Sequence, residues 1–299
     1  MQTSKSAAKL TNSYWQFASI AGMTLRRFIL FGLLAVCALT WGISFAQTQR
    51  QHGPDDPANT VMLEQMTWTD VHAALQNGFD TVIIPTAGIE QNGPHLVLGK
   101  HAIVVRHTAQ EIARKLGHTL VLPVIDYVPE GDVSPQPTGH MAFPGTISVP
   151  ASVFEQVLEA AAKSMRAHGF KTILFIGDSG GNQASQAKVA QKLSALWQGE
   201  NILVAHVGDY YTANGQVAYL RGRGFSDAQI GSHAGIRDTS EVLYIQPSAV
   251  RTGSYSPPAS WPTGARGVPS LARAGLGQTM IDLKINAAVR QIRALQAQR

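Results

Sequence analysis

The stretch T-I-L-F-I-G-D-S-G-G-N, residues 172–182, decides the class of fold. Its first five residues are apolar or β-branched and show no polar alternation, which is typical of a strand buried on both faces of a parallel sheet. A glycine-rich turn follows, and a helical pattern begins after Asn182. A buried strand that leads through a short turn into a helix indicates a β-α-β unit.

Three other runs have the same character: Thr81–Ile84, Thr119–Ile125 and Ile202–Val207. Helical patterns separate the runs, and each has an apolar face that we expect to point inward. The inward residues expected in three helices are Val105, Ala109, Ile112 and Leu116; Phe154, Val157, Leu158, Ala161 and Met165; and Val189, Leu193, Leu196 and Trp197. The alternation predicts a single α/β domain with a mostly parallel sheet flanked by helices.

The N-terminus has the pattern of an export signal. Arg26 and Arg27 precede an uncharged apolar stretch, residues 28–43, and S-F-A at 44–46 fits a signal-peptidase site. We assign residues 1–46 to an N-terminal extension and signal peptide, with translation starting at Met1 or Met23. An exported, periplasmic or secreted protein without a stable membrane span is expected. The alternative is an uncleaved N-terminal anchor.

Residues 47–60 read as a flexible leader and residues 61–299 as the folded domain. The single cysteine, Cys37, falls inside the signal, so the mature chain would have no disulfide and no cysteine ligand. A net charge of +5 without a lysine or arginine run argues against a nucleic-acid partner.

Polar, glycine-rich loops follow the predicted strands, where ligands bind in open parallel sheets. They are residues 86–101, 126–146 and 177–182, with a fourth candidate at 233–240. In the first loop, the side chains of Glu90, Asn92, His95 and His101 offer oxygen and nitrogen donors. Such donors suit Zn²⁺ or Mn²⁺, although a solvated loop with a helix-capping Asn or His is the alternative.

The four loops also carry a family resemblance. E-Q-N-G-P-H-L-V-L-G-K-H at 90–101 resembles the creatininase (creatinine amidohydrolase) signature, approximately E-x-H-G-x-H-L-P-L-x-x-D. H-M-A-F-P-G-T-I-S at 140–148, G-D-S-G-G-N at 177–182 and H-A-G-I-R-D-T-S at 233–240 match further family segments in the same order. The resemblance implies a metal-dependent amidohydrolase that acts on a C–N bond of a small-molecule amide. Family members are often oligomers, so a homo-oligomer is implied.

Carried over position by position, the family's metal ligands become Glu90, Asn92, His101 and Ser179, of which only Glu90 is unchanged. An amide oxygen and a hydroxyl are poor ligands in place of two imidazoles. We therefore do not expect a two-metal centre. A single ion remains plausible, with Glu90, His101 and Asp178 supplying three ligands and a bound water as nucleophile.

In this interpretation His233 matches the family's catalytic histidine and acts as a proton shuttle, with Asp238 orienting its ring. His140 matches a pocket histidine, and His95 is placed around the pocket, bracing the loop from behind the ligands.

Two other functions fit the same residues. G-D-S-G-G satisfies G-x-S-x-G between a strand and a helix, so Ser179 could act as a nucleophile with His233 as base and Asp209 or Asp238 as the orienting acid. Alternatively, the chain is a non-catalytic small-molecule-binding protein that has kept the pocket and lost the metal.

Overall fold

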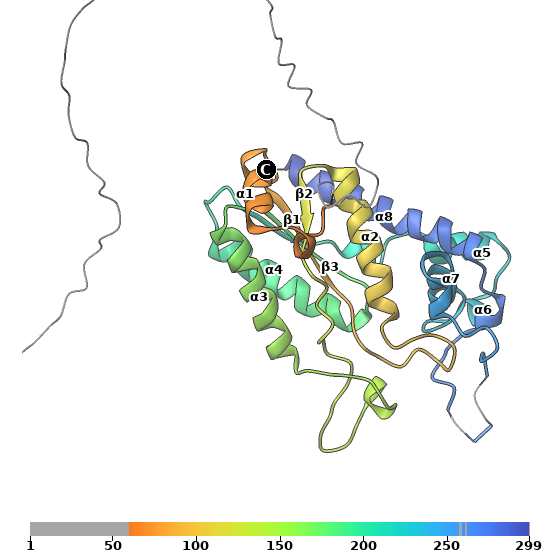
Figure 1. Cartoon of the computed structure of the whole chain (residues 1–299). Helices are drawn as coiled ribbons and strands as arrows, with labels where there is room; N and C mark the ends of the chain where they lie inside the picture. Colours follow the sequence, from red (N-terminus) through yellow and green to blue (C-terminus); the bar gives the residue numbers. More distant parts are fainter. Residues whose placement is uncertain (1–59, 257–258, 261, 299) are drawn as a thin grey trace, which may run out of the picture. The chain divides into compact units, whose positions relative to one another are not determined.

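The structure is a computed structural model, and it describes residues 60–256, 259–260 and 262–298 (Figure 1). These residues belong to one compact unit. The predicted signal peptide and nearly all of the leader lie outside the described residues, so export stays a prediction. Within the described ranges, no helix has the length and apolar character needed to cross a membrane.

A four-stranded parallel sheet forms the centre of the described part, in the order β2-β1-β3-β4. The strands are β1 (Thr81–Thr86), β2 (Thr119–Val121), β3 (Thr172–Gly177) and β4 (Leu203–His206). In the register, Thr81 of β1 lies opposite Thr119 of β2 and Thr172 of β3. All residues of β1 and β3 are buried, as the unalternating apolar runs predict.

Helices cover both faces of this sheet (Figure 1). They are α1 (Trp68–Gln76), α2 (Lys100–Leu116), α3 (Ala151–Ala167), α4 (Gln183–Leu196), α5 (Gln216–Gly222), α6 (Asp227–Ile230), α7 (Ile236–Ile245) and α8 (Ala274–Ala297). Apolar residues of α2, α7 and α8 pack with Ile83 and Leu174 in one core layer. Residues of α3 and α4 pack with Val82 and Ile173 in the other. The predicted parallel α/β fold is confirmed.

Two details differ from the sequence-based expectation. The run Thr119–Ile125 forms a strand only as far as Val121, and Ile125 makes an isolated bridge to Thr86. Pro123, which has no N–H to give to a ladder, lies between them.

Two apolar residues assigned to inward helix faces are exposed instead: Val157 at 43% and Leu196 at 58%. In α3 the buried stripe runs through Phe154, Leu158 and Ala162, and Val157 lies beside it. The expectation for these two side chains was wrong because residues at the margin of an apolar stripe can face solvent.

The loops that leave the carboxyl ends of the strands lie at one edge of the sheet, as parallel topology requires. Glu90 follows β1, His140 follows β2 and Asp178 follows β3. The start of α7 and the middle of α8 close the same edge, because both helices pack on the core layer that α2 covers.

Candidate active site

A pocket of about 680 Å³ opens at this edge of the sheet. Its wall comes from the loops after β1, β2 and β3, from the segment around His233, and from Lys284 of α8. Charged and imidazole side chains dominate the wall and many of them are buried. Buried charges need partners, so the pairing within the pocket determines what it can bind.

His101, in the first turn of α2, lies between two carboxylates. Its Nε2 is 2.7 Å from Oε1 of Glu90, and its Nδ1 is 2.8 Å from Oδ2 of Asp178. Burial and the nearby Lys100 lower the pKa of His101, but the two carboxylates outweigh them and raise it to about 9. Both ring nitrogens therefore donate, and His101 is an imidazolium at neutral pH.

The pairing continues from Asp178 into α8. Oδ1 of Asp178 accepts hydrogen bonds from Lys284 Nζ at 2.7 Å and from the Tyr210 hydroxyl at 2.9 Å. Lys284 Nζ is also 3.1 Å from Oε1 of Glu241. A continuous series of buried charges therefore runs through the pocket wall: Glu90, His101, Asp178, Lys284 and Glu241.

A second buried pair joins α2 to α7. Lys100 Nζ is 2.7 Å from Oδ2 of Asp238, and the same oxygen accepts a hydrogen bond from the Ala234 N–H at 2.7 Å. Asp238 therefore orients the backbone beside His233, and no hydrogen bond joins it to the His233 ring among the described residues. Its predicted role as direct partner of that ring is not seen in this arrangement.

The His233 ring has a defined tautomer. Its Nε2 is 2.8 Å from the Gln91 carbonyl oxygen, which can only accept, so Nε2 carries the proton. Nδ1 then presents a lone pair, and it lies 3.7 Å from Oε1 of Glu90. Burial, with a further contribution from Lys100, lowers the pKa of His233 to about 4, which keeps the ring neutral near pH 7.

His140 approaches Glu90 from the loop after β2. Its Nε2 is 3.3 Å from Oε2 of Glu90, and its Nδ1 is 3.0 Å from the Gln91 side-chain nitrogen. That amide is oriented because it also donates to the Gly264 carbonyl and accepts from the Gly93 N–H. The Nδ1 of His140 accepts from Gln91, so its Nε2 proton points toward Glu90.

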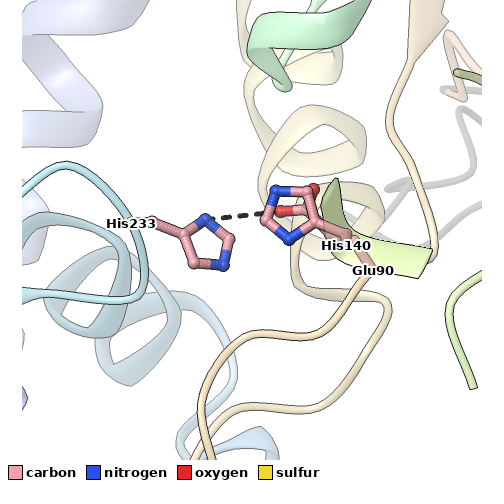
Figure 2. A group of neighbouring side chains, drawn as sticks. All are labelled: Glu90, His140 and His233. Atoms are coloured by element: carbon pink, nitrogen blue, oxygen red, sulfur yellow. Dashed lines mark ion pairs between the residues drawn. The ribbon is translucent and has the colours of Figure 1, made fainter. Parts of the chain in front are cut away.

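Glu90, His140 and His233 together form a candidate metal site, which we call the ligand trio (Figure 2). Each offers one ligand atom, and these atoms all lie within 4.8 Å of one another. Ligand atoms at about 2.1 Å from a tetrahedral ion are about 3.4 Å apart. The His140 Nε2 is 3.3 Å from Oε2 of Glu90 and the His233 Nδ1 is 3.7 Å from Oε1, so the two imidazoles approach different oxygens of one carboxylate. The trio can hold one ion when the His140 proton lies on Nδ1 instead of Nε2, because Nε2 then presents its lone pair to the ion.

This trio differs from the set expected from the sequence, in which Glu90 was joined by His101, Asn92 and Asp178. The ring nitrogens of His101 are both engaged by carboxylates, one of them from Asp178. The Asn92 amide donates to the backbone carbonyls of Glu90, Val97 and Leu98, so it braces the loop.

His95 also lies behind the pocket. It is fully buried, and its Nε2 is 3.0 Å from the hydroxyl of Thr239 in α7. This contact joins the loop after β1 to α7, and the bracing role of His95 stays a prediction. Ser179 does line the pocket, but its backbone is extended at φ −107° and ψ 148°, and its hydroxyl is not paired with His233.

Glu130 is a pocket residue whose position the sequence did not settle. It is 5% exposed and lies against Glu90. Burial first, and the Glu90 charge second, raise the pKa of Glu130 to about 9, so it holds a proton at neutral pH. Its Oε1 also approaches the backbone at Gly88, where a Cβ atom would lie 2.0 Å from that oxygen.

Sequence reasoning missed Lys284, Glu241 and Arg237. Lys284 had a visible signal, because it sits inside the apolar stripe of α8 between Met280 and Ala287. A lysine in such a stripe is seldom buried without a carboxylate partner.

Comparisons with known proteins agree with this architecture. The family model described as creatinine amidohydrolase matches residues 64–292. Creatinine amidohydrolase of Pseudomonas putida is 22% identical over 213 residues, covering 69% of this chain and 80% of that protein. A mycofactocin precursor peptide peptidase of Mycobacterium ulcerans is 25% identical over 216 residues, covering 70% and 75%.

Solved structures share the fold. A creatininase described in its Mn form has a TM-score of 0.63 at 19% identity, over 79% of this chain and 98% of that one. A mutant creatininase described as Zn-Zn type has a TM-score of 0.60 at 20% identity, over the same shares.

The fold and the ligand trio define an α/β protein with a candidate metal site at the carboxyl edge of a parallel sheet. The family match spans most of the chain. The chain belongs to the creatininase family.

Proposed function

We propose that this protein is an amidohydrolase that cleaves a C–N bond with the help of one divalent ion held by Glu90, His140 and His233. The convergence of these three side chains in the pocket of a creatininase-family fold carries the proposal. The bound ion would supply Lewis acidity and an activated water. Zinc and manganese both suit carboxylate and imidazole ligands, and related structures are described in Mn and Zn-Zn forms.

The neighbours of the trio hold it in place. His101 binds one oxygen of Glu90 and so orients that carboxylate. The Gln91 carbonyl fixes the His233 ring with its Nδ1 lone pair toward Glu90. Such contacts behind the ligands commonly change metal affinity by about 10–100-fold.

The pocket also limits the substrate class. At about 680 Å³ it has the size of sites that bind drug-sized ligands. Arg237 lines it, and its Nε is 3.3 Å from Oδ1 of Asp238; among the described residues its two terminal nitrogens make no hydrogen bond, so they can face a substrate. We propose an amide substrate with a carbonyl or carboxylate group that these donors bind. Creatinine and peptide amides are both candidates, following the names of two relatives.

The test is turnover of an amide panel by protein loaded with Mn²⁺ or Zn²⁺. We expect Glu90→Gln and His140→Asn to lose at least about 100-fold in kcat/KM, because each removes a ligand. The control His168→Asn changes a histidine outside the pocket lining and should keep full activity. Equal turnover by the trio variants and the control would refute the proposal.

The serine-hydrolase alternative makes the opposite prediction for Ser179. Ser179→Ala should keep turnover within a few-fold of wild type, because His233, the base expected for a serine mechanism, faces Gln91 and Glu90 instead. Covalent labelling of wild-type Ser179 by a fluorophosphonate, with loss of turnover in Ser179→Ala, would favour the serine mechanism instead.

A further inference from the structure

The feature that the proposed function does not use is the ammonium group of Lys284, buried between two carboxylates in the pocket wall. Its side chain is 5% exposed, and those of Asp178 and Glu241 are 4% and 3% exposed. Nζ lies 2.7 Å from Asp178 and 3.1 Å from Glu241, and it is 5.0 Å from the centre of the Tyr210 ring. The ammonium is thus surrounded by oxygen atoms and one aromatic face.

The two carboxylates are held for this cation by other groups. The Tyr210 hydroxyl donates to Asp178 at 2.9 Å, and the Gln216 amide donates to Glu241 at 2.6 Å. Two buried carboxylates would repel each other strongly without a positive charge between them. The Lys284 ammonium lies between the two carboxylates, and the His101 imidazolium binds the other oxygen of Asp178.

We infer that the Lys284 ammonium takes the place that a second metal ion would otherwise occupy, so that the pocket binds at most one divalent ion. Oxygen-rich, buried, doubly anionic surroundings are those of a divalent cation site. Here a side chain delivered by α8 supplies the positive charge and repels any further ion nearby. One related structure is described in a Zn-Zn form, whereas the described part of this chain has one ligand trio and places an ammonium between Asp178 and Glu241.

The loop chemistry points the same way. Two positions where the family resemblance places metal ligands are Asn92 and Ser179, which offer an amide and a hydroxyl in place of imidazoles. The side-chain nitrogen of Asn92 donates hydrogen bonds to backbone carbonyls of its own loop. Among the other carboxyl groups of the pocket wall, Lys284 holds Asp178 and Glu241, Lys100 holds Asp238, and Glu130 lies against Glu90.

The inference about Lys284 rests on the proposed function only for the ion held by the ligand trio. The test below distinguishes failure of the inference from failure of the proposed function. The experiment measures Mn²⁺ bound per chain after saturation, together with the Tm in chelator and in excess Mn²⁺. Wild type should bind one ion. A count of two ions would overturn the inference and leave the proposed function intact. A count of zero would refute the proposed function. The Lys284 variants would then decide the inference.

In the decisive variants, Lys284→Met and Lys284→Gln, the two carboxylates lose their cation. We expect each to bind one ion more than wild type, and Tm to fall by at least about 5 °C in chelator and to recover with Mn²⁺. Lys192→Met removes an exposed lysine paired with Glu159 and should change neither quantity. If both Lys284 variants keep the wild-type count, or fold no better with Mn²⁺ than without it, the inference fails.

Discussion

Several side chains of the pocket contact Glu90, and each of its two carboxylate oxygens has its own partners. Oε1 is bound by His101 and faces His233, and Oε2 faces His140. Burial opposes ionisation, but the charge and hydrogen bond of His101 hold the pKa of Glu90 far below its usual range. Glu90 is therefore a carboxylate at neutral pH, as a metal ligand must be.

At the residue scale, the tautomer of His140 is the feature of the trio that opposes binding of an ion. Gln91 donates to its Nδ1, which leaves a proton on the Nε2 that faces Glu90. Gln91→Glu would replace that donor with an acceptor, allow a proton on Nδ1 and free Nε2 for the ion. We expect Mn²⁺ to bind about tenfold more tightly in the variant, as measured by titration calorimetry.

The matched control for this change is Gln198→Glu, which adds the same charge at an exposed position after α4. It should leave the Kd for Mn²⁺ unchanged. Equal or weaker binding by Gln91→Glu would show that His140 is not a ligand.

Glu90, His140 and His233 could all be singled out from the sequence, because each lies in a segment that resembles the creatininase family. Their grouping into one trio could not be predicted, since it depends on which way each side chain points. The position of His101 between two carboxylates could not be predicted from the sequence either. It depends on the fold, in which the loop after β3 places Asp178 beside the His101 ring.

At the scale of elements, a buried ion pair joins the start of α2 to the start of α7. Lys100 and Asp238 are 2.7 Å apart, and both side chains are almost fully buried. The pair also ties down the backbone beside His233 through the Ala234 N–H. Two helices that are distant in the sequence are thereby fixed around the same pocket.

Asp238→Asn should destabilise the protein by about 3 kcal/mol, because it leaves the Lys100 ammonium buried without its main counter-charge. The measurement is the free energy of unfolding from urea denaturation. Asp227→Asn breaks an exposed pair with Arg221 and should leave stability nearly unchanged. A similar small effect from both variants would show that the buried pair does not hold α2 and α7 together.

The order and type of the main elements followed from the sequence, since β1, β3 and β4 are buried apolar runs separated by amphipathic helices. The length of β2 did not follow from the sequence. Hydropathy alone predicts a strand that continues past Val121, but a proline two residues later limits the hydrogen-bond ladder. Hydropathy could not predict the burial of Lys284 in α8 either, since its partners come from the loop after β3 and from α7.

At the scale of the whole molecule, the charges of the pocket make stability depend on pH. The folded-state pKa values of His101 and Glu130 are both raised to about 9, so the folded protein holds protons that the unfolded chain has released. Stability therefore falls as pH rises wherever the folded state binds more protons.

For metal-free protein we expect the free energy of unfolding to decrease between about pH 6.5 and 9, at up to about 1.4 kcal/mol per pH unit for each group. Urea denaturation across this range measures it. His101→Gln should flatten part of the slope, because the variant has no group that titrates at that position. A stability that rises from pH 6.5 to 9 would contradict the assigned charge states.

The most direct test of the central claim is an activity titration of chelator-treated protein with Mn²⁺, using an amide substrate that the wild type cleaves. If Glu90, His140 and His233 hold one ion, turnover should be absent in chelator, rise with added Mn²⁺ and level off at about one ion per chain. Full turnover in chelator, or an unchanged titration curve for Glu90→Gln, would contradict the account.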